Sequence, residues 1–175
     1  WAIVVAWVWL TQDRLVYFPQ VGRNNTATPQ AAGLRFEDLR IKTADGETLA
    51  AWWVPVPADK GRGAVLLLHG NAGSIADRIM YLPHFTAMGY GVLMVDYRGY
   101  GQSSGSPDEE GTYADARAAW RWLNERGFTP GDIVLVGESL GGAVAAELAA
   151  RVQPRALLLL STFTSVNDLG RELYP

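Results

Sequence analysis

The stretch Ile133-Val134-Leu135-Val136-Gly137-Glu138-Ser139-Leu140-Gly141 decides the fold. Its first four residues are apolar, and a short run of this kind is typical of a strand buried on both faces. The Ala-rich residues 142–152 that follow favour a helix. The chain must therefore turn within a few residues at Ser139, and G-x-S-x-G between a strand and a helix is typical of a nucleophile elbow.

The residue types in this turn suit nucleophilic catalysis by Ser139. Glycines at 137 and 141 leave room where a Cβ would clash in a sharp turn, and Glu138 lies beside the serine and supports it. The following helix directs its N–H groups and positive dipole end at developing negative charge, so the Leu140 N–H is the first candidate for an oxyanion-hole donor. The alternative is a plain strand-to-helix turn built from small residues.

Composition excludes several classes of protein. With 175 residues, 49% hydrophobic and 19% charged, the chain is a folded domain or part of one. A net charge of −3 gives no basic surface for nucleic acid. There is no cysteine and there are two histidines, which excludes a thiolate site and leaves little material for zinc. We therefore expect no metal and no cofactor.

The N-terminal residues 1–10 form an apolar run, which is too short to span a bilayer. We interpret residues 1–19 as the remnant of a hydrophobic membrane anchor and its connector, with Trp7, Trp9 and Tyr17 suited to the membrane interface. The protein would then be membrane-associated, on a side that the sequence does not reveal. The alternative is a buried N-terminal strand or helix of a soluble protein.

The rest of the chain divides into a polar linker over residues 20–33 and an α/β domain over residues 34–175. The domain starts with a predicted antiparallel hairpin, whose Asp-Gly turn at 45–46 is a strong signal. Apolar strands then alternate with helices, which predicts a doubly wound, mostly parallel sheet covered on both faces. The predicted strands are 34–42, 48–55, 63–68, 91–97, 133–136 and 156–160, and the predicted helices are 76–88, 112–126 and 142–152.

A second glycine-containing loop, His69-Gly70-Asn71-Ala72-Gly73, follows the strand 63–68. Ligands of open α/β sheets bind at the carboxyl ends of the strands, so this loop and Ser139 should lie at the same edge of the sheet and line one binding site. We assign the second oxyanion donor to the Asn71 N–H, with Ala72 as the less favoured choice, and His69, Gly70 and Gly73 as loop support. The alternative is a glycine-rich turn with a structural His69. Neither His69 nor His84 is expected to be the general base.

The loop Asp96-Tyr97-Arg98-Gly99-Tyr100-Gly101 lacks the lysine and third spaced glycine of a nucleotide site. We expect Asp96 and Arg98 to hold it by charge-assisted hydrogen bonds, with its tip lining the pocket. Residues 107–111 are interpreted as a turn followed by the start of a helix.

Together these motifs resemble the α/β-hydrolase superfamily, and more narrowly the Bem46-like serine hydrolases, whose relatives include membrane-anchored ABHD-type enzymes. The resemblance rests on residues 68–73, 96–101, 137–142 and 161–165, and on Leu15-Val16-Tyr17-Phe18-Pro19 after a hydrophobic N-terminus. It implies Ser139 as nucleophile and a hydrophobic anchor before the hydrolase domain.

In this family the triad runs Ser, Asp, His along the chain. Only 36 residues follow Ser139, and none of them is histidine. Asp168 is better interpreted as a helix cap than as the triad acid. We therefore expect the chain to lack its C-terminal strands, with the acid and the base beyond Pro175, and to be nearly inactive as it stands.

The expected activity of the complete protein is cleavage of an ester, thioester or amide through an acyl-serine intermediate, on a small-molecule or acyl substrate. Two alternatives stay open. The first is a non-catalytic hydrolase-like binding or scaffold protein, since fold does not dictate function. The second is a serine peptidase of the prolyl-oligopeptidase type. The sequence leaves the oligomeric state undetermined.

Overall fold

A computed structural model describes residues 1, 7, 16–21, 24–56 and 61–162. Its centre is a six-stranded sheet in the order β1-β2-β4-β3-β5-β6. β1 pairs antiparallel with β2, β2 pairs antiparallel with β4, and all other neighbours are parallel. The predicted mostly parallel sheet with an antiparallel start is confirmed. The strands are β1 (Glu37–Lys42), β2 (Thr48–Val54), β3 (Gly63–Leu68), β4 (Tyr90–Val95), β5 (Ile133–Glu138) and β6 (Ala156–Leu160).

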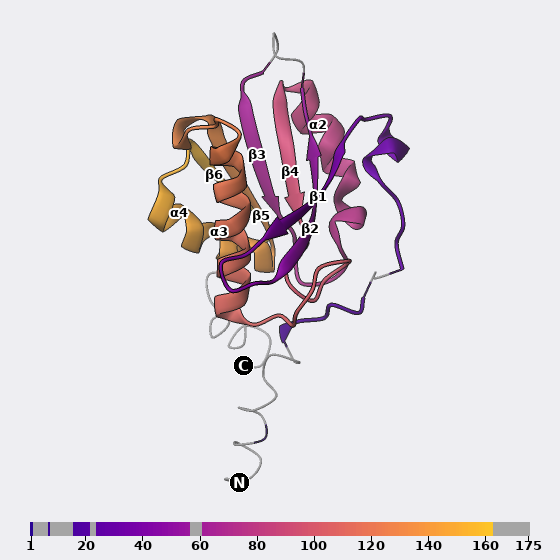
Figure 1. Ribbon diagram of the computed structural model, residues 1–175, viewed down its shortest axis with the longest axis vertical. Coiled ribbons are helices and arrows are strands. Elements are labelled where there is room, and N and C mark those ends of the chain that lie inside the picture. The colour runs from indigo at the N-terminus through magenta and orange to yellow at the C-terminus, as the bar shows by residue number, and fades with distance from the viewer. Residues whose placement is uncertain (2–6, 8–15, 22–23, 57–60, 163–175) are drawn as a thin grey trace.

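Helices cover both faces of this sheet. Helices α3 and α4 pack on one face, and η3 and α2 pack on the other (Figure 1). The helical segments are the 3₁₀ helices η1 (Pro29–Ala32), η3 (Ile75–Tyr81) and η4 (Pro130–Asp132) and the α-helices α2 (Leu82–Ala87), α3 (Glu109–Glu125) and α4 (Leu140–Val152).

Strand β3 shows how one apolar run serves two cores. Side chains of a strand point alternately to its two faces. Leu66 and Leu68 accordingly pack in the core under α3 and α4, while Val65 and Leu67 pack in the core under α2. All four are almost completely buried, which explains why the sequence here is continuously apolar rather than alternating.

The predicted helix 76–88 differs from the structure. It is divided into the 3₁₀ helix η3 and the short α2, which meet at Leu82. Pro83 lies in the first turn of α2, where its missing N–H does no harm, whereas one uninterrupted helix would place it in the interior. Ser74 and Asp77 form a capping box that fixes the start of η3.

Two predicted strands are shorter in the structure. The strand predicted over 34–42 begins at Glu37, and the strand predicted over 91–97 ends at Val95. The latter ends where Tyr97 begins a turn closed by the Tyr100 N–H. Helix α3 begins earlier than predicted because Asp108 caps it, accepting a hydrogen bond from the Gly111 N–H at 2.7 Å.

Of the first 33 residues, the structure describes residues 1, 7, 16–21 and 24–33. Residues 24–33 contain η1, and the Asn25 side chain donates to Asp77 Oδ1 at 2.7 Å, tying this segment to η3. In the described part of the chain, no helix is both long and apolar enough to cross a membrane. Most of the proposed anchor, residues 2–6 and 8–15, lies outside the described residues.

Strand β6 has one neighbour, β5, among the described residues. Its three central leucines are 37–48% exposed, whereas the equivalent residues of β3 and β5 are buried. The sequence predicts that every parallel strand is covered on both faces. Within the described part of the chain, β6 lacks such cover.

Candidate active site

Ser139 occupies the sharp turn between β5 and α4, with φ 52° and ψ −116°. A positive φ is uncommon for a residue other than glycine, asparagine or aspartate, so this backbone is strained. Two backbone hydrogen bonds hold it, one from the Ser139 N–H to Leu160 O at 2.8 Å and one from the Gly142 N–H to Ser139 O at 2.9 Å. The turn leaves Ser139 partly exposed.

The glycines around Ser139 allow three segments to touch. A Cβ on Gly137 would lie 2.6 Å from Gly142 Cα, and one on Gly141 would lie 2.5 Å from His69 O. Both distances are shorter than real Cβ contacts, and both neighbours are backbone atoms that cannot turn away. The glycines are therefore required by the close approach of α4 to β5 and to the end of β3.

The loop 69–73 lies against the elbow, as expected for loops at the carboxyl ends of neighbouring parallel strands. A Cβ on Gly70 would lie 3.3 Å from Ser139 Cβ. The Asn71 side chain anchors the loop, because its Oδ1 accepts from the Phe18 N–H at 3.0 Å and from Tyr100 Oη at 2.9 Å. Within the described chain, neither the Asn71 N–H nor the Leu140 N–H donates a hydrogen bond to the protein.

Arg78 connects the loop to the elbow, and sequence reasoning missed it. Its guanidinium forms a fork with Glu138, through Nε to Oε2 at 3.2 Å and Nη2 to Oε1 at 3.1 Å. Its Nη1 donates to Ala72 O at 2.7 Å. The side chains of Arg78 and Glu138 are only 12% and 24% exposed. Sixty positions separate the two partners, and no local pattern in the sequence signals the pairing.

His69 is completely buried between its own loop, 69–73, and the loop 96–105. Its Nδ1 donates to Gly70 O at 2.7 Å, and its Nε2 lies 3.5 Å from Asp96 Oδ1. Burial lowers the pKa of His69 to about 3, so the ring is neutral at physiological pH. Both ring nitrogens thus face groups other than Ser139, as expected for a residue that braces the loop.

The other histidine, His84, lies away from the elbow on α2. His84 lies exposed on α2 and its Nδ1 is 3.0 Å from Met80 O. Asp168 lies outside the described residues.

The loop 96–105 is held mainly by Arg98. Its guanidinium donates to the buried Asp115 on α3, through Nε at 3.0 Å and Nη2 at 2.8 Å, and its Nη1 donates to Asp45 in the hairpin turn at 2.8 Å. Burial raises the pKa of Asp115, against the lowering effect of the hydrogen bonds from Arg98. Asp96 accepts from the Ile75 N–H at 2.8 Å, so it ties this loop to η3.

Among the described residues, no three or more His, Cys, Asp or Glu side chains are grouped so that they could hold a metal ion.

Comparison with known proteins identifies the same family. The family model described as "alpha/beta hydrolase fold" matches residues 63–175. An uncharacterized protein of Mycobacterium tuberculosis is 40% identical over 98% of this chain and 61% of its own length. Protein bem46 of Schizosaccharomyces pombe is 35% identical over 99% of this chain and 60% of its own length.

The solved structure of the Pyrococcus furiosus esterase Pf2001 superposes with a TM-score of 0.69 and 27% identity, over 88% of this chain and 59% of the esterase. A relative named for its activity, the lysophosphatidylserine lipase ABHD12 of Danio rerio, is 35% identical over 92% of this chain and 47% of its own length. The chain thus spans about 60% of the length of the first relatives that it matches. With this sheet order, an elbow after β5 and a family match over residues 63–175, the chain belongs to the α/β-hydrolase family.

Proposed function

We propose that the protein is a serine hydrolase that cleaves carboxylic esters, with thioesters and amides open to the same mechanism. One observation carries the proposal: Ser139 occupies a strained, positive-φ turn between the end of β5 and the first turn of α4. A serine tolerates this backbone only where the surroundings enforce it, and such strain gathers at functional sites. The presence of an esterase and a lipase among the similar proteins supports the ester class.

In the proposed reaction, Ser139 Oγ attacks the substrate carbonyl carbon while a general base takes its proton. The carbonyl oxygen becomes an oxyanion, which accepts hydrogen bonds from the Leu140 and Asn71 N–H groups at the positive end of α4. Collapse of the tetrahedral intermediate expels the alcohol, which receives the proton from the base. Water then cleaves the acyl-serine by the same steps and releases the acid.

The general base is proposed to lie outside the 175 residues. Both histidines of the chain are accounted for, since His69 faces Gly70 and Asp96 and His84 lies on the exposed side of α2. The relatives are longer than the matched span, which leaves room for the acid and the base in the family's order. The 175-residue chain alone is therefore expected to retain only the residual rate that oxyanion hole and binding supply.

Membrane attachment through residues 1–19 is part of the proposal. It rests on the apolar run at 1–10 and on a 35% identical relative from Saccharomyces cerevisiae that is named as an uncharacterized membrane protein. Flotation with liposomes tests it. The chain should float with the vesicles and a chain starting at residue 16 should stay behind; equal behaviour of both would contradict attachment by this segment.

A fluorophosphonate probe tests the catalytic proposal, because it phosphonylates only an activated serine. The protein extended to the length of its relatives should be labelled at Ser139, and its Ser139→Ala variant should not be. The 175-residue chain should react far more slowly. Rapid stoichiometric labelling of the 175-residue chain would show that the base lies within it, and unlabelled extended protein would favour a non-catalytic role.

A further inference from the structure

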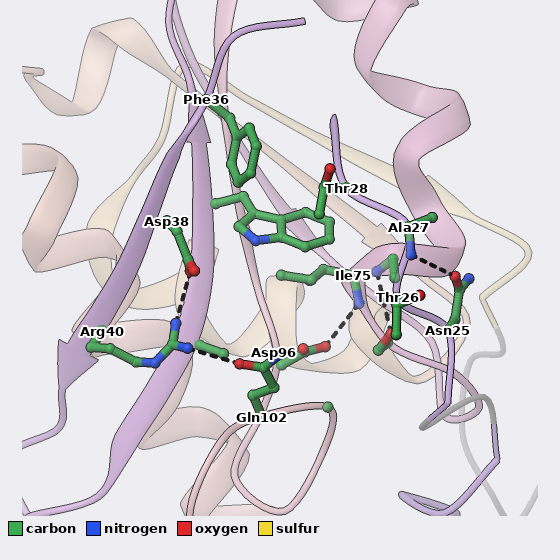
Figure 2. A pocket seen from close by; sticks show the side chains of 15 residues that line it. Asn25, Thr26, Ala27, Thr28, Phe36, Asp38, Arg40, Ile75, Asp96 and Gln102 are labelled. Atoms are coloured by element: carbon green, nitrogen blue, oxygen red, sulfur yellow. Dashed lines mark hydrogen bonds and ion pairs between the residues drawn. The ribbon is translucent and has the colours of Figure 1, made fainter. Parts of the chain in front are cut away.

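We propose that a cavity beside the β1–β2 hairpin is a binding site for a small organic ammonium ion, separate from Ser139. The cavity has a volume of about 180 Å³ and lies between the β1–β2 hairpin, the segment 25–28 and the start of η3. Figure 2 shows Asp38 and Arg40 on one side, Asn25 and Thr26 on the other, and Asp96 between them. Neither Ser139 nor Leu140 lines it, so the proposal does not depend on the hydrolase activity.

The carboxylate of Asp96 is the anionic group of this cavity. Asp96 follows β4 directly and is only 3% exposed, yet it lines the cavity. Its Oδ1 accepts from the Ile75 N–H at 2.8 Å and lies 3.5 Å from Nε2 of His69, whose ring is neutral and so brings no positive charge. Its Oδ2 receives no hydrogen bond from any described residue, and it lies so close to Gly101 that a Cβ there would collide with it. A glycine at 101 thus leaves Oδ2 uncovered.

Arg40 also lines the cavity, but its guanidinium already donates hydrogen bonds to other side chains. Arg40 donates from Nη1 to Asp38 Oδ1 at 2.8 Å and from Nη2 to Gln102 Oε1 at 2.8 Å, both on the exposed rim. Arg40 therefore neutralises Asp38, and the side chain of Asp96 supplies the remaining charge of the cavity lining. A buried carboxylate without a cationic partner is costly, and a ligand that brings a positive charge would offset that cost.

The remaining walls select an organic rather than an inorganic cation. Phe36 and Trp52 pack edge to face with their ring centroids 5.7 Å apart and give the cavity an aromatic side. Aromatic rings attract organic cations and also bury their carbon atoms. The hydroxyls of Thr26 and Thr28 also line the cavity and make no hydrogen bond within the described chain, so they can accept from an ammonium N–H.

The ionisation of Asp96 gives the site a signature. Burial raises the pKa of Asp96 to about 7, because the low-dielectric surroundings disfavour the charged form. The hydrogen bond from Ile75 and the charge of Arg78 act against this rise, and the charge of Asp77 adds to it. The ammonium ion binds the carboxylate and not the carboxylic acid. Binding should therefore strengthen about tenfold as the pH rises from about 6 to about 8, since the ionised fraction rises by that factor.

Benzylammonium chloride is a suitable probe, because it combines an ammonium group with one ring and fits a cavity of this size. Titration calorimetry on the purified protein should detect binding, and benzyl alcohol, its neutral analogue, should bind at least about tenfold more weakly. The indole N–H resonance of Trp52, assigned by its loss in Trp52→Phe, should shift on titration. Equal binding of the two ligands, or an unmoved Trp52 resonance, would overturn the proposal.

Two carboxylate variants complete the test. Asp96→Asn should abolish benzylammonium binding, whereas Glu37→Gln, which removes a surface carboxylate that pairs with Arg126 and does not line the cavity, should leave it within about twofold. Equal effects of the two would mean that only the general negative charge of the surface attracts the cation. If Asp96→Asn fails to fold, the pH series on the unaltered protein still decides, because binding that does not change between about pH 6 and about pH 8 contradicts a role for Asp96.

Discussion

The link made by Arg78 between the loop 69–73 and the elbow leads to a quantitative prediction. Replacing Arg78 by alanine removes two hydrogen bonds to Glu138 and one to Ala72 O. It leaves Glu138, at 24% exposure, without its cation. Breaking a fully buried ion pair costs about 3–5 kcal/mol, and an exposed one costs about 0.2–1 kcal/mol. The partial burial of this pair places the expected loss of unfolding free energy at about 2–3 kcal/mol.

Urea unfolding of the variants measures this loss, with the slope of the transition checked for constancy. A double-mutant cycle of Arg78→Ala and Glu138→Gln isolates the pair and should give a coupling of about 1–2 kcal/mol, while the contact with Ala72 stays in the single Arg78 effect. Arg78→Lys should recover less than half of the loss, because an ammonium group cannot form the fork.

Arg151 on α4 provides the matched control. It also pairs with a glutamate, Glu147, but its side chain is 62% exposed and the pair lies one helical turn apart. Arg151→Ala should cost no more than about 0.5 kcal/mol. An Arg78→Ala variant as stable as Arg151→Ala, or additive effects of the Arg78 and Glu138 changes, would refute the view that this ion pair holds the loop to the elbow.

Three further changes test other parts of the structure. The unfolding free energy of Ser139→Gly should exceed that of Ser139→Ala by about 1 kcal/mol, because only glycine adopts the positive φ without strain. Equal denaturation midpoints of the two variants would contradict backbone strain at Ser139. Gly141→Ala should prevent folding, because its Cβ meets backbone oxygens at the end of β3, whereas Gly131→Ala has open space and should fold normally, as circular dichroism would show. Asp96→Asn should gain stability relative to the unaltered protein as the pH rises from about 4 to about 7, by up to about 4 kcal/mol. The pKa of Asp96 is about 7 in the folded protein and about 3.8 in the unfolded chain, so over this range the unfolded chain ionises first and the unaltered folded protein loses stability. Unfolding curves that stay parallel over that range would contradict it.

Much of the fold could be predicted from short-range patterns. The apolar runs at 63–68 and 156–160 have the bounds of β3 and β6, and the Asp-Gly turn fixes the hairpin. These features depend on hydrophobic periodicity and turn chemistry, which act within a few residues. The position of Ser139 between β5 and α4 follows from the same local information.

The contacts that hold the site together were not predictable, because they join residues far apart in the sequence. Arg78 looks like an ordinary residue of a predicted helix, and nothing near it indicates Glu138 as its partner. The cavity around Asp96 likewise combines a hairpin, a segment predicted as a linker and the start of η3. Only the folded arrangement of the sheet defines which of these side chains meet.

The strand order has a consequence for the time course of folding. The hairpin β1–β2 pairs neighbours in the chain, whereas β3 must wait for β5, which is synthesised after β4 and α3, before Leu68 can lie beside Gly137. Closing such long loops is slow compared with local pairing. During refolding, helical ellipticity should therefore return before Ser139 reaches its turn, and the environment of that serine would report the moment at which the sheet closes.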